Sequence, residues 1–487
     1  MIPLLLTALM QAGGGGELVL AVDRLHDGTG QVIENAVVVV SGGKIRAITP
    51  GAAPEGAIHV AGAELSPGLV DAYSYMGVGG AALEESREST PSMSVSATAD
   101  LDDAAFGRAA AEGVTSAYLS PDSFNVVAGL GVMVKTAGGQ PADLYAAAGS
   151  AAWILKDAVA LKIVFGGDSS SGNYPPGRGG DAKGRRPTTR MGVTWEIRRQ
   201  FYKAIAYREA RASGAVAEDA DMEVLVAALE GRIPVRAQAR AAHDVQTALR
   251  LQEEFGWPRM ILEEGTEAHR VAGLLAAAGV PVATGPAYDT TGRAIVNSPT
   301  VEELERFVHP DPVCCEHIHE EGYDERAETG LVPLSGLALE LALRTVPASE
   351  ASGLQRGRRS EGDHATPAAA GLLRRAGVVT AFGAAEAHDA PATEASVIHQ
   401  ARTAIAWGLD PAEALPMATS VPAALCGVAD RVGTLEAAMD ADRVPWSGPP
   451  LAAGSRPLLL LAYGRLVADA RDDRLPPAPP CAFPPRS

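Results

Sequence analysis

The stretch Pro67-Gly68-Leu69-Val70-Asp71-Ala72-Tyr73-Ser74-Tyr75-Met76-Gly77 lies where a hydrophobic run changes into a polar loop bounded by glycine. A buried strand that ends in such a loop is typical of an α/β barrel, in which the chemistry is carried at the carboxyl ends of the strands. We therefore predict that a barrel begins here. The side chains of Tyr73 and Tyr75 are then expected at its open end.

Length and composition limit the class of protein. The 487 residues suit one large barrel with an accessory domain better than a single small core. Hydrophobic residues make up 47% and charged residues 21% of the chain, as is typical of a soluble globular protein. With 41 Lys and Arg against 59 Asp and Glu, the net charge is −18 and no long basic run is present. Nucleic acid is therefore not an expected partner.

Residues 1–16 combine a short apolar run with four glycines. This pattern resembles a signal peptide followed by a linker, although it has no basic residues at its start. We predict export to the periplasm or the exterior, with a cytoplasmic protein as the alternative. The run is too short to span a bilayer as a helix, and no other stretch is long and apolar enough, so an integral membrane protein is not expected.

The two ends of the chain both show a strand pattern. Strand-like runs separated by turn residues occupy 17–25, 36–40, 44–49 and 57–61. They predict a small antiparallel unit that cannot close a core alone. A second set of strand-like runs and turns lies between residues 432 and 467.

Between the ends, strands alternate with helices, as in a parallel barrel. The predicted strands are 114–119, 233–237, 260–264, 280–284 and 378–382, and the predicted helices include 104–113, 195–212 and 393–407. Another helix is expected to bury Val271, Leu274, Leu275 and Ala278. Residues 286–365 interrupt this pattern with a long polar insertion, which predicts a lid, an interaction surface or partial disorder. The tail, residues 476–487, is rich in proline and is predicted to be unstructured.

These segments resemble the amidohydrolase superfamily. The opening stretch is similar to its "PGLIDAHxH" signature, and residues 432–467 resemble its "GSLxxGKDADLVV…V…GRxV" ending. The segments Pro187–Val193, 233–235 and Glu263–Glu267 look most like the imidazolonepropionase-like group. The resemblance implies a distorted (β/α)8 TIM barrel at 68–430, with the insertion at about 286–365, and a small composite β-sandwich formed from 17–67 and 431–475.

In that group zinc or another divalent metal is held by paired histidines on the first strand, histidines on strands 5 and 6 and an aspartate on strand 8. The family reaction is metal-dependent hydrolysis of non-peptide C–N bonds in amides or cyclic amides. Here the matching positions hold Tyr73 and Tyr75, the run Arg236-Ala237-Gln238-Ala239-Arg240, Glu264, and Gly383-Ala384-Ala385-Glu386. Phenols are poor zinc ligands at neutral pH, and an amide or a guanidinium is worse. We therefore predict a degenerate site with no metal and no cofactor.

The replaced positions still predict a cluster at the barrel mouth. Side chains alternate along a strand, so three side chains of the strand-5 run should share one face. The residues expected to bind a ligand or one another are Tyr73, Tyr75, Arg236, Gln238, Arg240 and Arg190. One interpretation is a salt-bridged plug that keeps the fold without the metal. The others are a metal-free site with Glu264 or Glu386 as base, and hydrolysis by an unusual set of metal ligands.

The leading hypothesis is an amidohydrolase-like pseudoenzyme, catalytically impaired, that binds a small ligand, forms homo-oligomers or pairs with an active relative. The first alternative is an active hydrolase with an altered or metal-free site. The second is a scaffold that acts through the insertion at 286–365.

Overall fold

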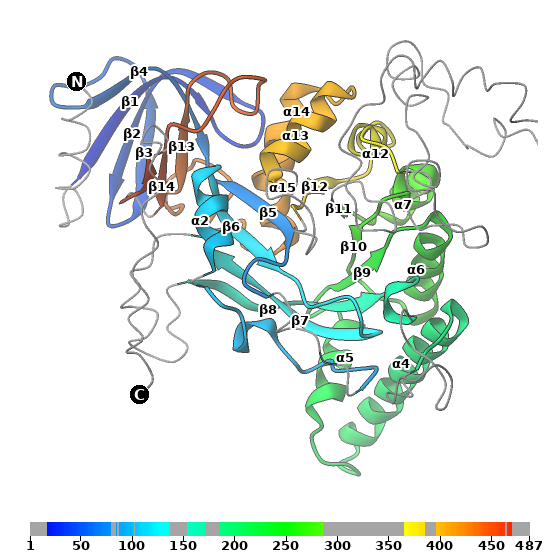
Figure 1. The fold of residues 1–487 in the computed structure, drawn as a ribbon. Coiled ribbons are helices and arrows are strands. Elements are labelled where there is room, and N and C mark those ends of the chain that lie inside the picture. The colour runs from blue at the N-terminus through cyan, green and yellow to red at the C-terminus, as the bar shows by residue number, and fades with distance from the viewer. Residues whose placement is uncertain are drawn as a thin grey trace, which may run out of the picture.

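The computed structural model describes residues 17–78, 84, 87–101, 103–136, 153–170, 186–285, 365–384, 396–462 and 465–469. The predicted signal segment, Glu386, the tail and almost all of the predicted insertion lie outside these residues. Two sheets organise the described part of the chain, one of seven strands and one of eight (Figure 1).

The seven-stranded sheet is built from both ends of the chain, in the order β15-β14-β13-β4-β1-β2-β3. Its strands are β1 (Leu18–His26), β2 (Val32–Ser41), β3 (Lys44–Pro50), β4 (Ile58–Pro67), β13 (Arg443–Trp446), β14 (Leu459–Ala462) and β15 (Arg465–Asp469). The blue N-terminal and red C-terminal strands lie side by side in Figure 1. This arrangement confirms that the two termini build one β domain.

The seven-stranded sheet encloses a hydrophobic core of its own. The amide of Ile45 on β3 donates to the carbonyl of Met439 at 2.9 Å, so the far edge of the sheet meets the segment before β13. Leu20, Leu65 and Leu461 are buried inside. The predicted N-terminal unit was wrong in one respect, because β4 pairs with β1 in parallel. The chain crosses over after β3 instead of continuing the antiparallel meander.

The eight-stranded sheet forms a nearly closed barrel in the order β12-β11-β10-β9-β8-β7-β6-β5. Its strands are β5 (Leu69–Ser74), β6 (Val114–Leu119), β7 (Val127–Lys135), β8 (Ile154–Val164), β9 (Val235–Ala239), β10 (Met260–Glu264), β11 (Val282–Thr284) and β12 (Thr380–Phe382). At the seam, the amide of Ala384 donates to Asp71 Oδ1 at 2.9 Å and joins the end of β12 to β5. The predicted barrel and composite β domain are thus confirmed.

The barrel departs from a wholly parallel order at β7, which runs antiparallel to both β6 and β8. Only residues 120–126 connect β6 to β7. A parallel crossover needs about a dozen residues or more, so this short link requires an antiparallel return. The strands β7 and β8 were not predicted from the sequence.

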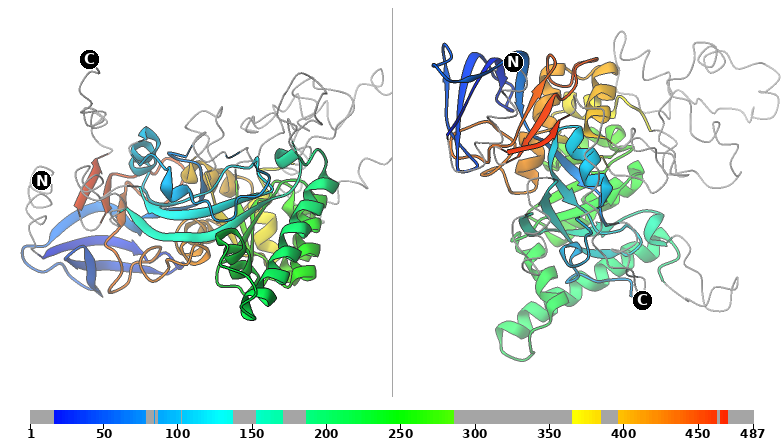
Figure 2. Two further views of the ribbon diagram at one scale, coloured as in Figure 1. Left: turned by 90° about the horizontal axis from the view of Figure 1, so that it is seen from below. Right: turned by 60° about the vertical axis from the view of Figure 1, so that its left-hand side comes forward.

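Helices cover the outside of the barrel. They are α2 (Ala104–Ala111), α4 (Arg190–Ala212), α5 (Ala220–Leu229), α6 (Ala242–Phe255), α7 (Ala272–Ala278), α12 (Ala369–Arg375), α13 (Val397–Ala406), α14 (Pro411–Met417) and α15 (Ser420–Leu425). The green helices α4 to α7 lie along one side of the sheet in Figure 2. Among the residues the structure describes, no helix has the length and hydropathy needed to cross a membrane.

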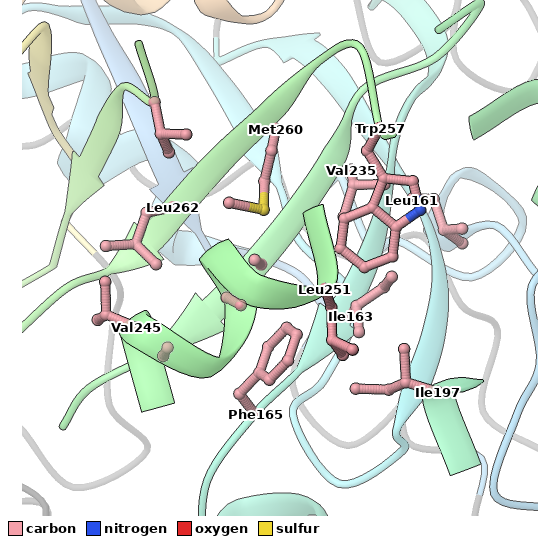
Figure 3. Close-up of a cluster of buried hydrophobic side chains, with 14 of the residues drawn as sticks. Leu161, Ile163, Phe165, Ile197, Val235, Val245, Leu251, Trp257, Met260 and Leu262 are labelled. Carbon is pink, nitrogen blue, oxygen red and sulfur yellow. The ribbon is translucent and has the colours of Figure 1, made fainter. Parts of the chain in front are cut away.

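The packing of this helical layer explains which strand residues point outward. In Figure 3, Val235 and Met260 from the strands pack against Leu251 of α6 and Ile197 of α4. The prediction for the helix after β10 was half right. Leu275 is buried, whereas Leu274 is 51% exposed because only one face of the short helix α7 meets the barrel. Ala278 is exposed as well.

Candidate functional site

Strand β9 directs its charged and polar side chains into the barrel. Val235, Ala237 and Ala239 belong to the apolar layer between the sheet and the helices. Because side chains alternate along a strand, Arg236 and Gln238 point to the opposite side, where they are almost completely buried. The sequence of β9 therefore brings a guanidinium and an amide into the barrel interior.

Strand β10 contributes two carboxylates through a local departure from regular strand geometry. Met260 and Leu262 pack outward, so the alternation sends Glu263 inward and would send Glu264 outward. Glu264 instead has a φ of 64°, in the left-handed region, and Gly265 follows with a φ of 58°. A non-glycine residue in this region is strained by about 1–3 kcal/mol. The turn brings the Glu264 carboxylate to the end of β5.

The two tyrosines of the opening stretch meet this carboxylate. The hydroxyl of Tyr73 donates to Glu264 Oε1 at 2.8 Å and lies 2.6 Å from the hydroxyl of Tyr75. The hydroxyl of Tyr75 lies 2.8 Å from Ser123 Oγ, which donates to Gln238 Oε1 at 2.5 Å. The chain of hydroxyls therefore links the ends of β5 and β9.

Arg240 and Asp168 close the network on the side of the solvent. Arg240 forms an ion pair with the Glu264 carboxylate. Its Nη2 lies 3.2 Å from Oε1, and its Nε lies close to Oε2. Its Nη1 lies 2.7 Å from Asp168 Oδ2. Gln238 Nε2 donates to Asp168 Oδ2 and to Glu264 Oε1, both at 3.2 Å. The side chains of Arg240 and Asp168 are 19% and 27% exposed, so this end of the network faces solvent.

A second layer of charge lies deeper in the barrel. Arg236 Nη1 donates to Glu263 Oε1 at 2.9 Å and to the carbonyl of Ala72 at 2.8 Å. Lys162 Nζ, from β8, lies 3.6 Å from Glu263 Oε2 and donates to the hydroxyl of Tyr75 at 2.8 Å. Its further acceptors are Ser120 Oγ, the carbonyl of Pro121 and Ser123 Oγ. Lys162, Arg236 and Glu263 are fully buried.

Burial shifts the acid–base behaviour of these groups. It raises the pKa of Tyr73 and of Tyr75 well above 10, and the negative charge of Glu264 adds to the effect. Both phenols therefore stay protonated at neutral pH. Burial lowers the pKa of Lys162, while the charge of Glu263 opposes that change. The oxygen acceptors around Nζ favour the ammonium form, which has three protons to donate.

The two layers balance in charge. Three cations, Lys162, Arg236 and Arg240, face three carboxylates, Asp168, Glu263 and Glu264. Charges inside a protein are tolerated when they are paired and hydrogen-bonded. The barrel mouth is thus an internally neutralised polar network.

The donor set at the mouth does not fit the divalent metal that the family implies. The phenols of Tyr73 and Tyr75 are held protonated and bonded to other side chains, and a neutral phenol is a weak zinc ligand. Lys162 donates to the hydroxyl of Tyr75 and Arg240 forms an ion pair with Glu264, so these oxygens are already bonded to cations of the chain. No set of three His, Cys, Asp or Glu residues within the described ranges is arranged to hold a metal ion.

The structure brings most of the sequence-predicted site residues together. Tyr73, Tyr75, Gln238, Arg240 and Glu264 share the upper layer. Arg236 lies one layer deeper.

Arg190 lies at the start of α4, where its Nε donates to both oxygens of Asp244 at 3.1 Å. Glu386 is outside the described residues. The roles of these residues in binding or catalysis remain predictions.

Sequence reasoning missed Lys162, Glu263, Asp168 and Ser123. One signal for Lys162 is its position in the apolar run Val159-Ala160-Leu161-Lys162-Ile163-Val164. A lysine in a buried strand requires a partner inside the protein. For Glu263, the alternation of β10 itself predicts an inward carboxylate beside the guanidinium of β9.

Comparisons with known proteins agree with this architecture. The profile of the amidohydrolase family matches residues 196–472, more than half of the chain. An amidohydrolase from Thermotoga maritima MSB8 is similar in structure, with a TM-score of 0.68 and 25% sequence identity, over 93% of this chain and 100% of that chain.

A Xaa-Pro dipeptidase with methionine bound in its active site has a TM-score of 0.50 at 15% identity, over 93% of this chain and 100% of that one. This second likeness concerns the fold alone. None of the curated protein sequences matches this chain significantly. On the family match and the barrel with its composite β domain, the chain belongs to the amidohydrolase family.

Proposed function

We propose that this chain is a metal-independent, catalytically impaired member of the amidohydrolase family that acts by binding a small ligand or a partner. One observation carries the proposal. The charges of Lys162, Arg236 and Arg240 are all satisfied by carboxylates of the same chain at the barrel mouth. A hydrolytic site of this family needs a metal-bound water there, and the network occupies that place with protein groups.

The bonds of Glu264 argue against an active, metal-free hydrolase with this residue as base. Its carboxylate accepts from the Tyr73 hydroxyl, from Gln238 Nε2 and from Arg240. A general base must lie within hydrogen-bonding reach of the proton that it removes. Glu264 would have to break bonds to charged and buried partners before it reached a substrate.

Metal content and turnover together test the loss of the family reaction. The full chain is purified, saturated with zinc, dialysed, and analysed for bound metal and for hydrolysis of amide, lactam and imidazolone substrates. We expect far less than one zinc per chain and no turnover. Near-stoichiometric zinc with turnover that disappears in Tyr73→Phe and Glu264→Gln would overturn the proposal. Turnover without zinc that is lost in Glu264→Gln would establish the metal-free alternative.

The solvent-facing end of the network is where we place ligand binding. Arg240 is bonded to Asp168, and both side chains are partly exposed. A ligand carboxylate would compete with Asp168 for the guanidinium, which binds planar anions through two parallel hydrogen bonds. Thermal shift with a panel of small carboxylates tests this, with Arg240→Gln expected to abolish the shift. Arg198→Gln is a matched control, because Arg198 is also a partly exposed arginine in an ion pair.

A further inference from the structure

Arg443 is the first residue of strand β13, which lies inside the seven-stranded sheet between β14 and β4. It pairs with Leu461 of β14 and with Pro67 of β4, both in antiparallel register. Residues directly opposite each other in such a pair lie on the same face of the sheet. Leu461 belongs to the hydrophobic core of the β domain, whereas Val444 belongs to a second core shared with Leu69 of the barrel. The side chain of Arg443 therefore lies on the face that covers the apolar core of the β domain.

The guanidinium of Arg443 has no hydrogen-bond acceptor within the described part of the chain. The residue is 0% exposed, and Nε, Nη1 and Nη2 are all without a partner. The fully buried Arg236 shows the contrast, because it donates to the Glu263 carboxylate and to the carbonyl of Ala72. A guanidinium carries five N–H groups, and a buried charge without a partner is strongly unfavourable. Arg443 therefore calls for an acceptor from outside the described residues.

The carboxylates nearest to Arg443 in the sequence are already bound by other cations. Asp442 acts on Arg443 through its charge, but its Oδ2 lies against Lys135 Nζ. The basic side chains that pair with Asp440, with Asp442 or with both are Lys44, Lys135 and Arg431. With Arg443 included, four cations share two carboxylates. This group of residues therefore carries two positive charges in excess.

Arg443 keeps its charge at neutral pH. Burial lowers its pKa to about 10, and the charge of Asp442 opposes this change. Three pH units below that value, about one guanidinium in a thousand is neutral. A water molecule accepts hydrogen bonds from a guanidinium but does not balance its charge. An anion does both, and hydrogen bonds between ionised groups are stronger than neutral ones.

The apolar surroundings decide the class of anion. Leu65 and Leu461, on the two strands that flank β13, are fully or almost fully buried in the same core, so an ion must lose its water to reach Arg443. The cost of removing an ion from water rises with its charge and falls with its radius. This excludes dianions such as sulfate and hydrogen phosphate and favours a large monovalent ion.

We propose that the core of the β domain binds a halide ion, chloride or bromide, on the guanidinium of Arg443. The site lies in the β domain, so the proposal goes beyond the function proposed for the barrel mouth and does not depend on it. The ion would bind only when the strands from the two ends of the chain have come together around Arg443. It would therefore stabilise the folded β domain in proportion to its concentration.

The halide dependence of stability tests this proposal. The full chain is unfolded with urea over a wide range of chloride concentrations, followed by circular dichroism, with the more strongly hydrated fluoride keeping the ionic strength constant. Above the dissociation constant, each tenfold rise in chloride should raise the ratio of folded to unfolded chain about tenfold.

The key variant is Arg443→Leu, which should lose the chloride dependence. It is expected to fold, because an apolar residue in place of an unpaired buried charge is often neutral or stabilising. The matched control is Arg402→Leu. Arg402 is also a partly buried arginine, but it donates to the carbonyls of Leu451 and Ser455, so this variant should keep the full dependence. General effects of salt are the same in all three chains and cancel in the comparison.

Crystals grown in bromide locate the ion directly. The natural chain should show an anomalous difference peak in contact with the Arg443 guanidinium, and Arg443→Leu should not. A natural chain whose stability does not depend on chloride overturns the proposal, as does an equal dependence in Arg443→Leu. Stabilisation by acetate but not by chloride would make the ligand a carboxylate and overturn the halide assignment.

Discussion

Two clusters of buried charge, one at the barrel mouth and one where the barrel meets the β domain, are built alike but serve different purposes. At the mouth, Lys162 of β8 lies against Glu263. At the junction, Lys135 at the end of β7 lies 3.1 Å from Asp440 and still closer to Asp442. In both clusters a lysine from the barrel is fully buried against acidic groups that come from another part of the chain.

The difference lies in how each cluster relates to the family pattern. Asp440 and Asp442 stand in the segment that resembles the "GKDADLVV" ending of amidohydrolases, so the junction keeps the family's residue types. At the mouth, the residues at the positions of the family's metal ligands are of other types, and they are hydrogen-bonded to one another. The junction thus keeps the residue types of the family, whereas the mouth, in the proposed function, has a structural network in place of a reactive centre.

The largest effect is expected at the junction. Lys135→Met removes the cation that lies between the buried carboxylates of Asp440 and Asp442. Because both carboxylates then lose this buried partner, the free energy of unfolding should fall by about 3–5 kcal/mol. Urea unfolding followed by circular dichroism measures the change. Lys44→Met is the matched control, because Lys44 pairs with the same Asp440 at 2.6 Å but is 41% exposed. It should cost about 1 kcal/mol or less. Equal losses in the two variants would contradict a structural role for the buried lysine.

Next in size is the mouth itself. Glu263→Gln keeps the shape of the side chain but leaves Lys162 and Arg236 without the carboxylate between them. The free energy of unfolding should fall by about 3 kcal/mol, less than at the junction, because Lys162 keeps its oxygen acceptors. The same substitution at Glu254, whose ion pair with Arg198 is exposed, should cost no more than about 1 kcal/mol. A stability unchanged in Glu263→Gln would mean that the mouth is not a structural plug.

This comparison also separates what the sequence predicts from what it does not. The opening stretch and the 432–467 segment predict the barrel and the composite domain, because strand and turn patterns are local properties. The alternation in β9 predicts that Arg236 and Gln238 share a face. The ion pairs of Glu263 with Arg236 and Lys162 were not predicted, because the three residues come from strands that are adjacent only in the folded barrel.

The backbone of Glu264 is a second limit of prediction. The alternation of β10 predicts an outward side chain, and only the left-handed φ of 64° turns the carboxylate inward. Such a conformation is unfavourable for an isolated residue and persists because Tyr73, Gln238 and Arg240 bind the carboxylate. Tertiary contacts of this kind have no local signature apart from the glycine that follows.

A smaller effect is expected for one hydroxyl at the mouth. Tyr73→Phe removes the donor to the Glu264 carboxylate and should lower the free energy of unfolding by about 1.5–3 kcal/mol, as for hydrogen bonds to charged groups. Tyr207→Phe is the control, because the Tyr207 hydroxyl also donates to a carboxylate, that of Glu223 at 2.7 Å, in a more exposed place. If Tyr73→Phe is no more costly than Tyr207→Phe, the buried hydroxyl chain does not stabilise the mouth.

The pH dependence of stability also distinguishes the two clusters. Burial raises the pKa of Tyr73 and Tyr75 above that of a free phenol, near 10, so the stability they contribute is complete below pH 10 and is lost as the pH rises further. Each phenol should cost about 1.4 kcal/mol per pH unit above 10. Lys162 acts in the opposite sense, because its pKa is lowered, but the two phenols outweigh one lysine.

The junction should respond at the acidic end instead. The charges of Lys135, Lys44 and Arg431 overcome the effect of burial and lower the pKa of Asp440, so its contribution is present above about pH 4 and is lost as the pH falls through the lowered value. Urea midpoints measured from acidic to alkaline pH test both ends. Tyr73→Phe should reduce the alkaline loss and leave the acidic loss unchanged, whereas Lys135→Met should do the reverse. The two clusters titrate independently only if each variant changes one end of the profile, so a variant that changes both ends would show that the charges of the mouth and of the junction interact.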